Sequence, residues 1–245
     1  GVLFTHQDRF KEAEDAYRQA ISVQSVLVDE FPASVSYHEP LILQWGNLGT
    51  VLWRTGRLDE AMEARQKQIE LLRDLVSQFP GQPAQKNQLG QAHFVLGFLC
   101  RERGEYEGAE AAYRTAIALN GELTADSRDN PVYQVNAANA WRDLGWLFAS
   151  TSRFDEAETA YREALRLHEA VVAAQPEEQH GLGGLAADYS GLGRLYRLRM
   201  RVNEATQAWE HAAELYRRLS ETAPDDPDFQ ADFADAQITL ASLQE

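Results

Sequence analysis

Small and apolar residues along this chain recur with a period of 48 residues. When the sequence is compared with itself at that shift, two columns contain alanine in all five copies, and a third contains a Leu-Gly pair such as Leu48-Gly49 in four. Self-similarity at a fixed period of this size indicates a chain built from repeated supersecondary units. The alanine columns are Ala13, Ala61, Ala109, Ala157, Ala205 and Ala16, Ala64, Ala112, Ala160, Ala208.

Each repeat has the hydrophobic spacing of two helices. Leu41, Trp45 and Leu48 begin an apolar stripe with helical spacing, which predicts a first helix, helix A, over residues 37–54. A second stripe starting at Leu58 predicts helix B over 57–78. Gly56 lies between them and can adopt the left-handed conformation that ends a helix. Each repeat is therefore predicted to be an antiparallel helical hairpin.

In certain columns the side chains have a similar size in every repeat, which indicates how these hairpins pack. Where two helices cross closely, glycine and alanine keep the backbones together, so we expect Gly49 to face Ala61. One helix B column is aromatic, with Arg65 as its exception, and is expected to fill the space between neighbouring hairpins. No hairpin buries its apolar face alone, so the repeats are expected to stack. The aromatic column contains Tyr17, Tyr113, Tyr161 and Trp209.

The order of these residues resembles the tetratricopeptide repeat. The matching positions are Trp45, Leu48, Gly49, Leu52 and Ala61, followed by Tyr113 or Tyr161 and by Ala116 or Ala164. The resemblance implies an all-α solenoid of stacked antiparallel hairpins that forms a right-handed superhelix. The usual period of this family is 34 residues, and the 14 additional residues amount to about four helical turns, so elongated helices are expected. Long-period arrays of this kind also resemble the repeat tails of some bacterial serine/threonine protein kinases.

The repeat register predicts one array over residues 1–245. It begins with a partial repeat, 1–36, and continues with four full repeats, 37–84, 85–132, 133–180 and 181–228. Residues 229–245 form a terminal helix, either a cap or a truncated repeat. Gly1 falls in the column of Gly49, inside a helix A, so we expect the chain to be a fragment or processed piece of a longer protein.

Charge and composition favour a protein partner. The chain has 23 Lys and Arg against 38 Asp and Glu, and its net charge of −15 disfavours binding to nucleic acid or to an anionic membrane. It contains no uninterrupted apolar run long enough to span a membrane. Cys100 is the only cysteine, which excludes an intramolecular disulfide and agrees with a reducing, cytoplasmic location.

Motifs that carry chemistry are weak in this sequence. Gly181, Gly183 and Ala186 fit a dinucleotide-binding pattern, but no strand precedes them, so a loop leading into a helix is expected. Cys100 lies in an apolar column and is expected to be a buried structural thiol. No catalytic constellation converges, so we expect neither an enzyme nor a bound cofactor.

Metal binding is also not expected. Asp225, Asp226 and Asp228 lack the spaced ligands and glycine of a calcium loop, and an inter-repeat turn is the preferred interpretation. The histidines fall in different columns, whereas a metal site needs clustered ligands. They are His6, His38, His93, His168, His180 and His211.

The resemblance implies a binding surface on the concave side, formed by helix A residues that do not pack between hairpins. The columns concerned begin at Leu43, Gly46, Thr50 and Trp53, and arginine and aromatic residues gather in them, as is typical of binding hot spots. The hypothesis is a non-catalytic scaffold that binds an extended, acidic peptide. Its candidate binding residues are Trp53, Gln91, Phe94, Phe98, Arg101, Asn139, Arg142, Trp146, Arg194 and Arg197.

Packing is the alternative interpretation of the same residues. The aromatic side chains can pack between neighbouring A helices, and the arginines can pair with Asp143, Asp188 or Glu204. The Lys and Asn pattern with which some tetratricopeptide proteins clamp a chaperone's C-terminal carboxylate is replaced here, so chaperone tails are not expected. The replacing residues are Gly46, Phe94, Arg142, Ser190 and Thr50, Phe98, Trp146, Arg194.

Two competing functions remain open at this point. Open end repeats can stack on another copy of the chain, which would make the array a self-assembly module. Alternatively, the array is the regulatory tail of a larger enzyme such as a serine/threonine protein kinase.

Overall fold

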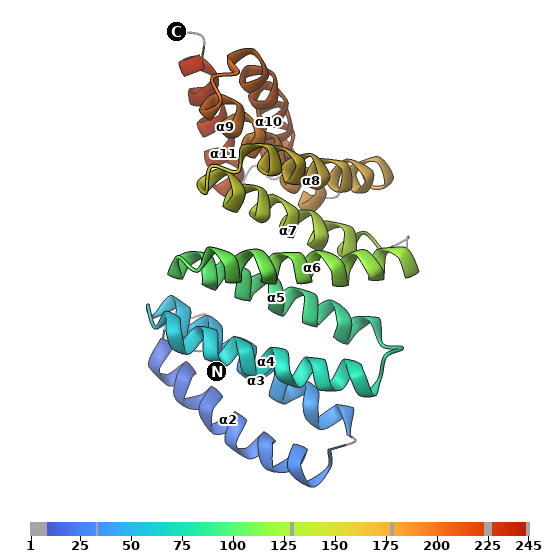
Figure 1. Ribbon diagram of the computed structural model, residues 1–245. Coiled ribbons are helices and arrows are strands. Elements are labelled where there is room, and N and C mark those ends of the chain that lie inside the picture. The colour runs from blue at the N-terminus through green and yellow to red at the C-terminus, as the bar shows by residue number, and fades with distance from the viewer. Residues whose placement is uncertain (1–8, 33, 128–129, 177–178, 223–226, 244–245) are drawn as a thin grey trace. The chain divides into compact units, whose positions relative to one another are not determined.

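The computed structural model describes residues 9–32, 34–127, 130–176, 179–222 and 227–243, and every regular element in them is an α-helix (Figure 1). This confirms the all-α prediction. Gly1, Asp225 and Asp226 lie outside the described residues. The helices are α2 (Phe10–Glu30), α3 (Val35–Arg54), α4 (Leu58–Gln78), α5 (Pro83–Arg103), α6 (Tyr106–Asp126), α7 (Pro131–Ser150), α8 (Phe154–Ala174), α9 (Gln179–Leu198), α10 (Val202–Thr222) and α11 (Pro227–Leu243).

The chain divides into two compact units, Gly1–Leu119 and Asn120–Glu245, here called unit 1 and unit 2. The boundary falls within α6. In unit 1, α2 packs on α3, α3 on α4 and α4 on α5. In unit 2, each helix from α7 to α11 packs on the next, and α7 also contacts α9. The single array predicted over 1–245 stays a prediction.

The predicted hairpins form with nearly the expected bounds, since α3 and α4 correspond to the predicted helices 37–54 and 57–78. The left-handed residue between them is Gly56, with φ 76°, and its equivalent Gly104 has φ 83°. In unit 2 the same turn position is held by Ser152 and Met200, which also have positive φ. A left-handed residue thus ends these four A helices even where the sequence supplies no glycine.

Close approach at the helix crossings explains the small columns. A Cβ placed on Gly49 would lie 3.3 Å from the carbonyl oxygen of Ala61, which confirms that these residues face each other. All five residues of the Ala61 column are completely buried. Behind the later glycines lie aromatic rings, as Tyr161 shows by packing between Gly145 of α7 and Gly191 of α9. The predicted role of this aromatic side chain is confirmed.

The core of unit 1 consists of two apolar clusters. One joins α2, α3 and α4, together with Leu99 of α5, around Tyr17, Leu48 and Leu52, and the other joins α3, α4 and α5 around Ile69 and Leu72. Because α3 and α4 contribute to both clusters, each stabilises the neighbours on either side, as expected for repeats that cannot bury their apolar surface alone.

Candidate functional site

The predicted binding columns of unit 1 lie on α3 and α5. We call this surface the A-helix face of unit 1; Leu43 and Trp53, near its two ends, are 57% and 41% exposed, although both are large apolar residues. On α5, Gln91 is exposed and Phe94, Phe98 and Arg101 are half-buried. The face consists of Leu43, Gly46, Thr50 and Trp53 on α3 and of Gln91, Phe94, Phe98 and Arg101 on α5.

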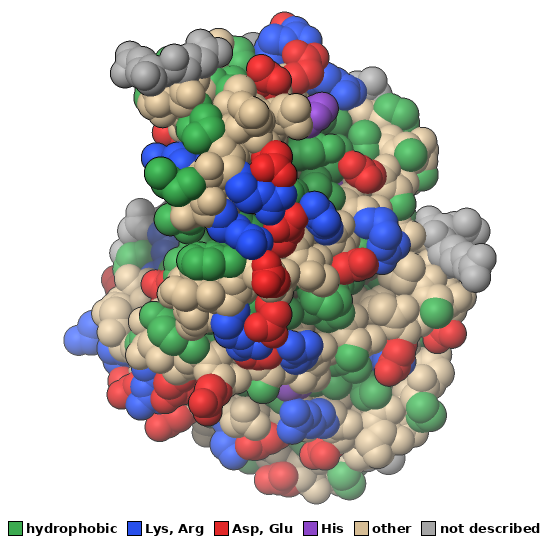
Figure 2. Space-filling model, turned by 45° about the horizontal axis from the view of Figure 1, so that its top comes forward, with side chains coloured by type: hydrophobic (Ala, Val, Ile, Leu, Met, Phe, Trp, Pro, Cys, Tyr) green, Lys and Arg blue, Asp and Glu red, His purple; other side chains and the backbone are tan. Residues whose placement is uncertain are grey.

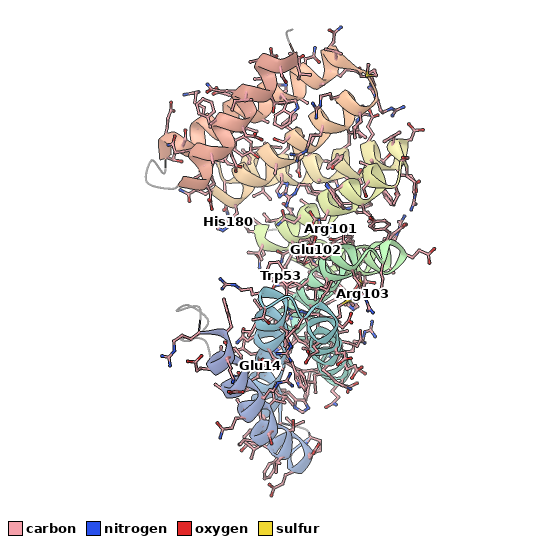
Figure 3. All side chains as sticks on the ribbon, turned by 90° about the vertical axis from the view of Figure 1, so that its left-hand side faces the viewer. Glu14, Trp53, Arg101, Glu102, Arg103 and His180 are labelled. Atoms are coloured by element: carbon pink, nitrogen blue, oxygen red, sulfur yellow. The ribbon has the colours of Figure 1, made fainter. Side chains whose placement is uncertain are left out.

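Three of the predicted site residues form an aromatic cluster at the C-terminal ends of α3 and α5. The edge of the Trp53 ring meets the Phe98 ring, with centroids 5.3 Å apart and planes at 82°. The Arg101 guanidinium lies over the Phe98 ring, 4.9 Å from its centroid. Figure 3 shows Trp53 and Arg101 near each other on their two helices. The cluster is packed, yet Trp53 keeps much of its ring available to a partner.

A cavity of about 680 Å³ lies toward the N-terminal part of the same face. It is bordered by α3, α4 and α5, and the exposed Leu43 and Gln91 form part of its lining. Amide side chains dominate its polar surface. They belong to Gln44, Gln68, Gln88 and Gln91.

Arg65 of α4 lies at the inner side of this cavity, and only 7% of it is exposed. Its guanidinium donates to the side-chain oxygen of Gln68 and, at 3.4 Å, to the backbone carbonyl of Gly46. Its Nε is buried without a hydrogen-bond acceptor. Burial lowers the pKa of Arg65 to about 10, so the side chain still carries its charge at neutral pH.

Phe94, by contrast, packs mainly within its own hairpin. Its ring lies 5.8 Å from that of Tyr113 on α6, at an interplanar angle of 51°. This contact joins the A and B helices of one hairpin, whereas the packing alternative placed Phe94 between neighbouring A helices.

In unit 2, Arg142 of α7 also has an internal partner. Its guanidinium lies 3.6 Å from Oδ1 of Asp188, and Oδ2 of the same carboxylate lies 2.6 Å from Nδ1 of His168. Asp188 and His168 are both completely buried. Burial raises the pKa of Asp188, and the hydrogen bond from His168 opposes that effect. The predicted pairing of an arginine with Asp188 is therefore confirmed for Arg142.

The other predicted residues of unit 2 remain largely on the surface. Trp146 is 43% exposed, Arg194 and Arg197 are exposed, and Asn139 is half-buried. The Arg194 guanidinium lies 5.9 Å from the Trp209 ring. Glu204, another predicted partner, bonds instead to Arg201.

The surface charges are mixed, and the face drawn in Figure 2 shows basic and acidic side chains interspersed. Among the described residues no group of three His, Cys, Asp or Glu side chains could hold a metal ion. Cys100 is buried, as predicted, and burial raises the pKa of its thiol. Within the described part of the chain, no helix is both long and apolar enough to cross a membrane.

Sequence reasoning missed two buried polar features. One is the cavity at Arg65, although Arg65 was identified as the exception to an aromatic column. The other is Asp188 with His168. A signal for it exists, since Asp188 occupies a column that otherwise contains Gln44, Ala92, Ala140 and Ala236. A charged residue in a column where three of the other members are buried alanines indicates a buried polar contact.

Comparison with solved structures identifies helical repeat proteins of similar fold. The P. vanneervenii protein BtubC (BKLC) superposes with a TM-score of 0.62 at 17% identity, covering 96% of this chain and 89% of that one. TPR-like repeats of a putative kinesin light chain from Podosopora anserina give 0.57 at 16% identity, covering 89% and 91%. The yeast histone chaperone Hif1 gives 0.57 at 16% identity, covering 85% and 96%. No curated protein matches by sequence.

Family models agree with these structures. Models described as tetratricopeptide repeat match residues 45–73, 90–123, 138–177 and 186–228. The last three matches begin 48 residues apart, in register with the period read from the sequence. Together the matches cover more than half of the chain, which belongs to the tetratricopeptide repeat family.

Proposed function

We propose that this chain is a non-catalytic scaffold that binds an extended protein segment on the A-helix face of unit 1. Tetratricopeptide repeat proteins are generally non-catalytic and mediate protein binding. The observation that carries the proposal is the cavity of about 680 Å³ bordered by α3, α4 and α5, beside the exposed Leu43. Its volume falls within the range typical of ligand sites, about 300–1,000 Å³.

The dimensions of the face suit a short extended segment. Leu43 and Trp53 are ten positions apart on α3, which corresponds to about 15 Å along the helix axis. An extended chain rises about 3.3 Å per residue, so roughly five residues would reach from the cavity to the aromatic cluster. Exposed leucine and tryptophan at the two ends offer apolar contacts, and the glutamine amides between α3 and α5 can bond to a peptide main chain.

The aromatic cluster at Trp53 has the composition of a binding hot spot. Binding hot spots are enriched in tryptophan and arginine, and Trp53 with its Phe98 and Arg101 neighbours supplies both in a preformed arrangement. A preformed site lowers the entropy lost on binding.

Selection from a library of displayed linear peptides tests the proposal. We expect peptides that bind the wild-type chain, and we expect Leu43→Asp to weaken them at least tenfold, because a charge replaces an apolar contact. Val23→Asp is the matched control, since Val23 is a similarly exposed apolar residue on α2. The proposal fails if no peptide is enriched, or if Leu43→Asp and Val23→Asp bind the selected peptides as well as wild type does.

A further inference from the structure

We infer that the cavity at Arg65 receives the carboxylate of a glutamate side chain from the bound segment, with Arg65 as its counter-ion. This inference rests on the proposed function and deepens it, because it names the residue that selects the partner's chemistry. It also assigns a role to a helix B residue, outside the A-helix columns from which the binding surface was predicted.

The cavity exists because two repeat positions depart together from the pattern of the next repeat. In the α5–α6 hairpin, Phe94 of the A helix stacks on Tyr113 of the B helix and fills the corresponding space. In the α3–α4 hairpin these positions hold Gly46 and Arg65. The Gln68 amide packs against Gly46, where a Cβ would lie 2.6 Å from Gln68 Nε2, and the Arg65 guanidinium reaches the Gly46 carbonyl. A buried charge and an amide that line a cavity thus stand where the next repeat has two aromatic rings.

The charge of Arg65 lacks an acidic partner within the described part of the chain. Its contacts there are neutral, namely the Gln68 amide and the Gly46 carbonyl, and Nε has no acceptor. Buried arginines are normally paired, because removing a charge from water is costly unless an opposite charge compensates it. Arg65 is therefore a buried cation whose missing counter-charge would come from a ligand.

Burial lowers the pKa of Arg65 to about 10, which leaves the guanidinium charged at neutral pH. A carboxylate that enters the cavity would meet a cation with little competing solvent. Charge-assisted bonds between guanidinium and carboxylate are strong under those conditions.

The other groups around the cavity distinguish a side chain from a chain terminus. Glu39 also lines the cavity, where its carboxylate accepts a hydrogen bond from Gln85 at 3.0 Å. It is seven positions from Gly46 on α3, about 10 Å along the axis. The glutamines that line the cavity are neutral, and their amides can bond to the main chain of a peptide that continues past the cavity. The side chain of an internal glutamate is longer than that of aspartate, so we expect it to reach an arginine as buried as Arg65.

A double-mutant cycle on a selected peptide tests this inference. We expect acidic residues to be enriched among the peptides selected by the wild-type chain. Replacing the critical glutamate by glutamine, or Arg65→Met in the protein, should each weaken binding by roughly 30-fold, the size expected for one half of a buried charge pair. The two changes together should cost little more than either one alone.

Lys67→Met is the matched control, because it removes one positive charge from an exposed position two residues away on α4. It should change affinity less than threefold. A peptide with an amidated C-terminus should bind as well as the free acid; loss of binding on amidation would assign Arg65 to a terminal carboxylate and overturn the inference. Additive effects of Arg65→Met and the peptide substitution would overturn it as well.

Thermal unfolding with acetate as the probe needs no peptide. At equal ionic strength, replacing chloride by acetate should raise the unfolding temperature of wild type by more than that of Arg65→Met, while Lys67→Met follows wild type. Equal shifts in all three proteins would contradict a carboxylate site. If library selection yields no peptide but acetate still stabilises wild type selectively, the proposed function fails and the anion site at Arg65 stands.

Discussion

The α3–α4 and α5–α6 hairpins of unit 1 are equivalent repeats that fill the same crossing in different ways. In the α5–α6 hairpin, the Phe94 and Tyr113 rings are in tilted contact, Tyr113 packs against Gly97, and Tyr113 is completely buried. In the α3–α4 hairpin, Gly46 and Arg65 take these positions and border a cavity. The backbone hairpin is nevertheless the same, because the glycine and alanine columns that set the helix approach are retained in both.

The comparison separates the residues that specify the fold from those that are free to vary. A Cβ on Gly49 would lie 3.3 Å from the carbonyl oxygen of Ala61, so a side chain larger than that of alanine does not fit between the helices without a shift. The position next to them tolerates tyrosine or arginine, which differ in charge and shape. The arginine is the less stable choice, since it buries a charge where the tyrosine buries a ring. A less stable choice at a cavity is a common property of binding sites.

Unit 2 provides a second contrast. Arg142 occupies the Gly46 column, and it approaches a buried carboxylate of its own chain, Asp188. Arg65 has no such acid among the described residues. The two arginines therefore differ in the charges around them: Arg142 lies 3.6 Å from an acid of its own chain, and Arg65 has a place for an external carboxylate.

The largest effect is expected from making the aromatic hairpin resemble the polar one. Tyr113→Arg places a charge against the Phe94 ring, and it removes a fully buried side chain. We expect a loss of about 3–5 kcal/mol in the free energy of unfolding, measured by urea denaturation. Tyr106→Arg on the exposed start of α6 is the control and should have little effect. Equal losses in both variants would show that the buried position at the α5–α6 crossing does not require an aromatic side chain.

The glycine column should respond differently in the two hairpins. A Cβ on Gly97 would lie 2.7 Å from the Tyr113 ring, which cannot move without disturbing Phe94. Gly97→Ala should therefore destabilise by about 1–3 kcal/mol. On Gly49 the nearest atom is 3.3 Å away, and the helix propensity of alanine offsets the strain, so Gly49→Ala should stay within about 1 kcal/mol of wild type. Differential scanning calorimetry of both variants measures these losses. A larger loss for Gly49→Ala than for Gly97→Ala would contradict the prediction and show that the Tyr113 ring is loosely packed.

The fold could be predicted because close helix approach imposes the same residue type in every repeat. Ala61 and Gly49 are constrained by backbone contact, and such a constraint appears as an unbroken column. The turn after each A helix was only half predicted. Gly56 signals a left-handed residue, but Ser152 and Met200 adopt that conformation without the glycine that would reveal it.

The candidate site could be predicted less completely, because it depends on combinations of residues. The columns located Trp53, Phe98 and Arg101 on adjacent helices, and the structure brings these three together. The cavity requires Gly46 and Arg65 at once, on different helices, and neither residue alone indicates a void. Periodicity identifies which column a residue occupies, but not which side chains of two columns share a volume.

The only gain in stability is expected from Arg65→Met. An apolar side chain of similar length removes the uncompensated buried charge and can fill part of the space below Gly46, so the free energy of unfolding should rise by about 1–2 kcal/mol in urea denaturation. Lys67→Met, at an exposed site on the same helix, should change it by less than about 0.5 kcal/mol. The same Arg65 variant is expected to lose peptide affinity, and a substitution that stabilises the fold while weakening binding marks a residue retained for its ligand. If Arg65→Met instead unfolds more easily, the Gln68 and Gly46 contacts already satisfy the guanidinium. The α3–α4 and α5–α6 hairpins would then differ in packing alone, and Arg65 would not be retained for a ligand.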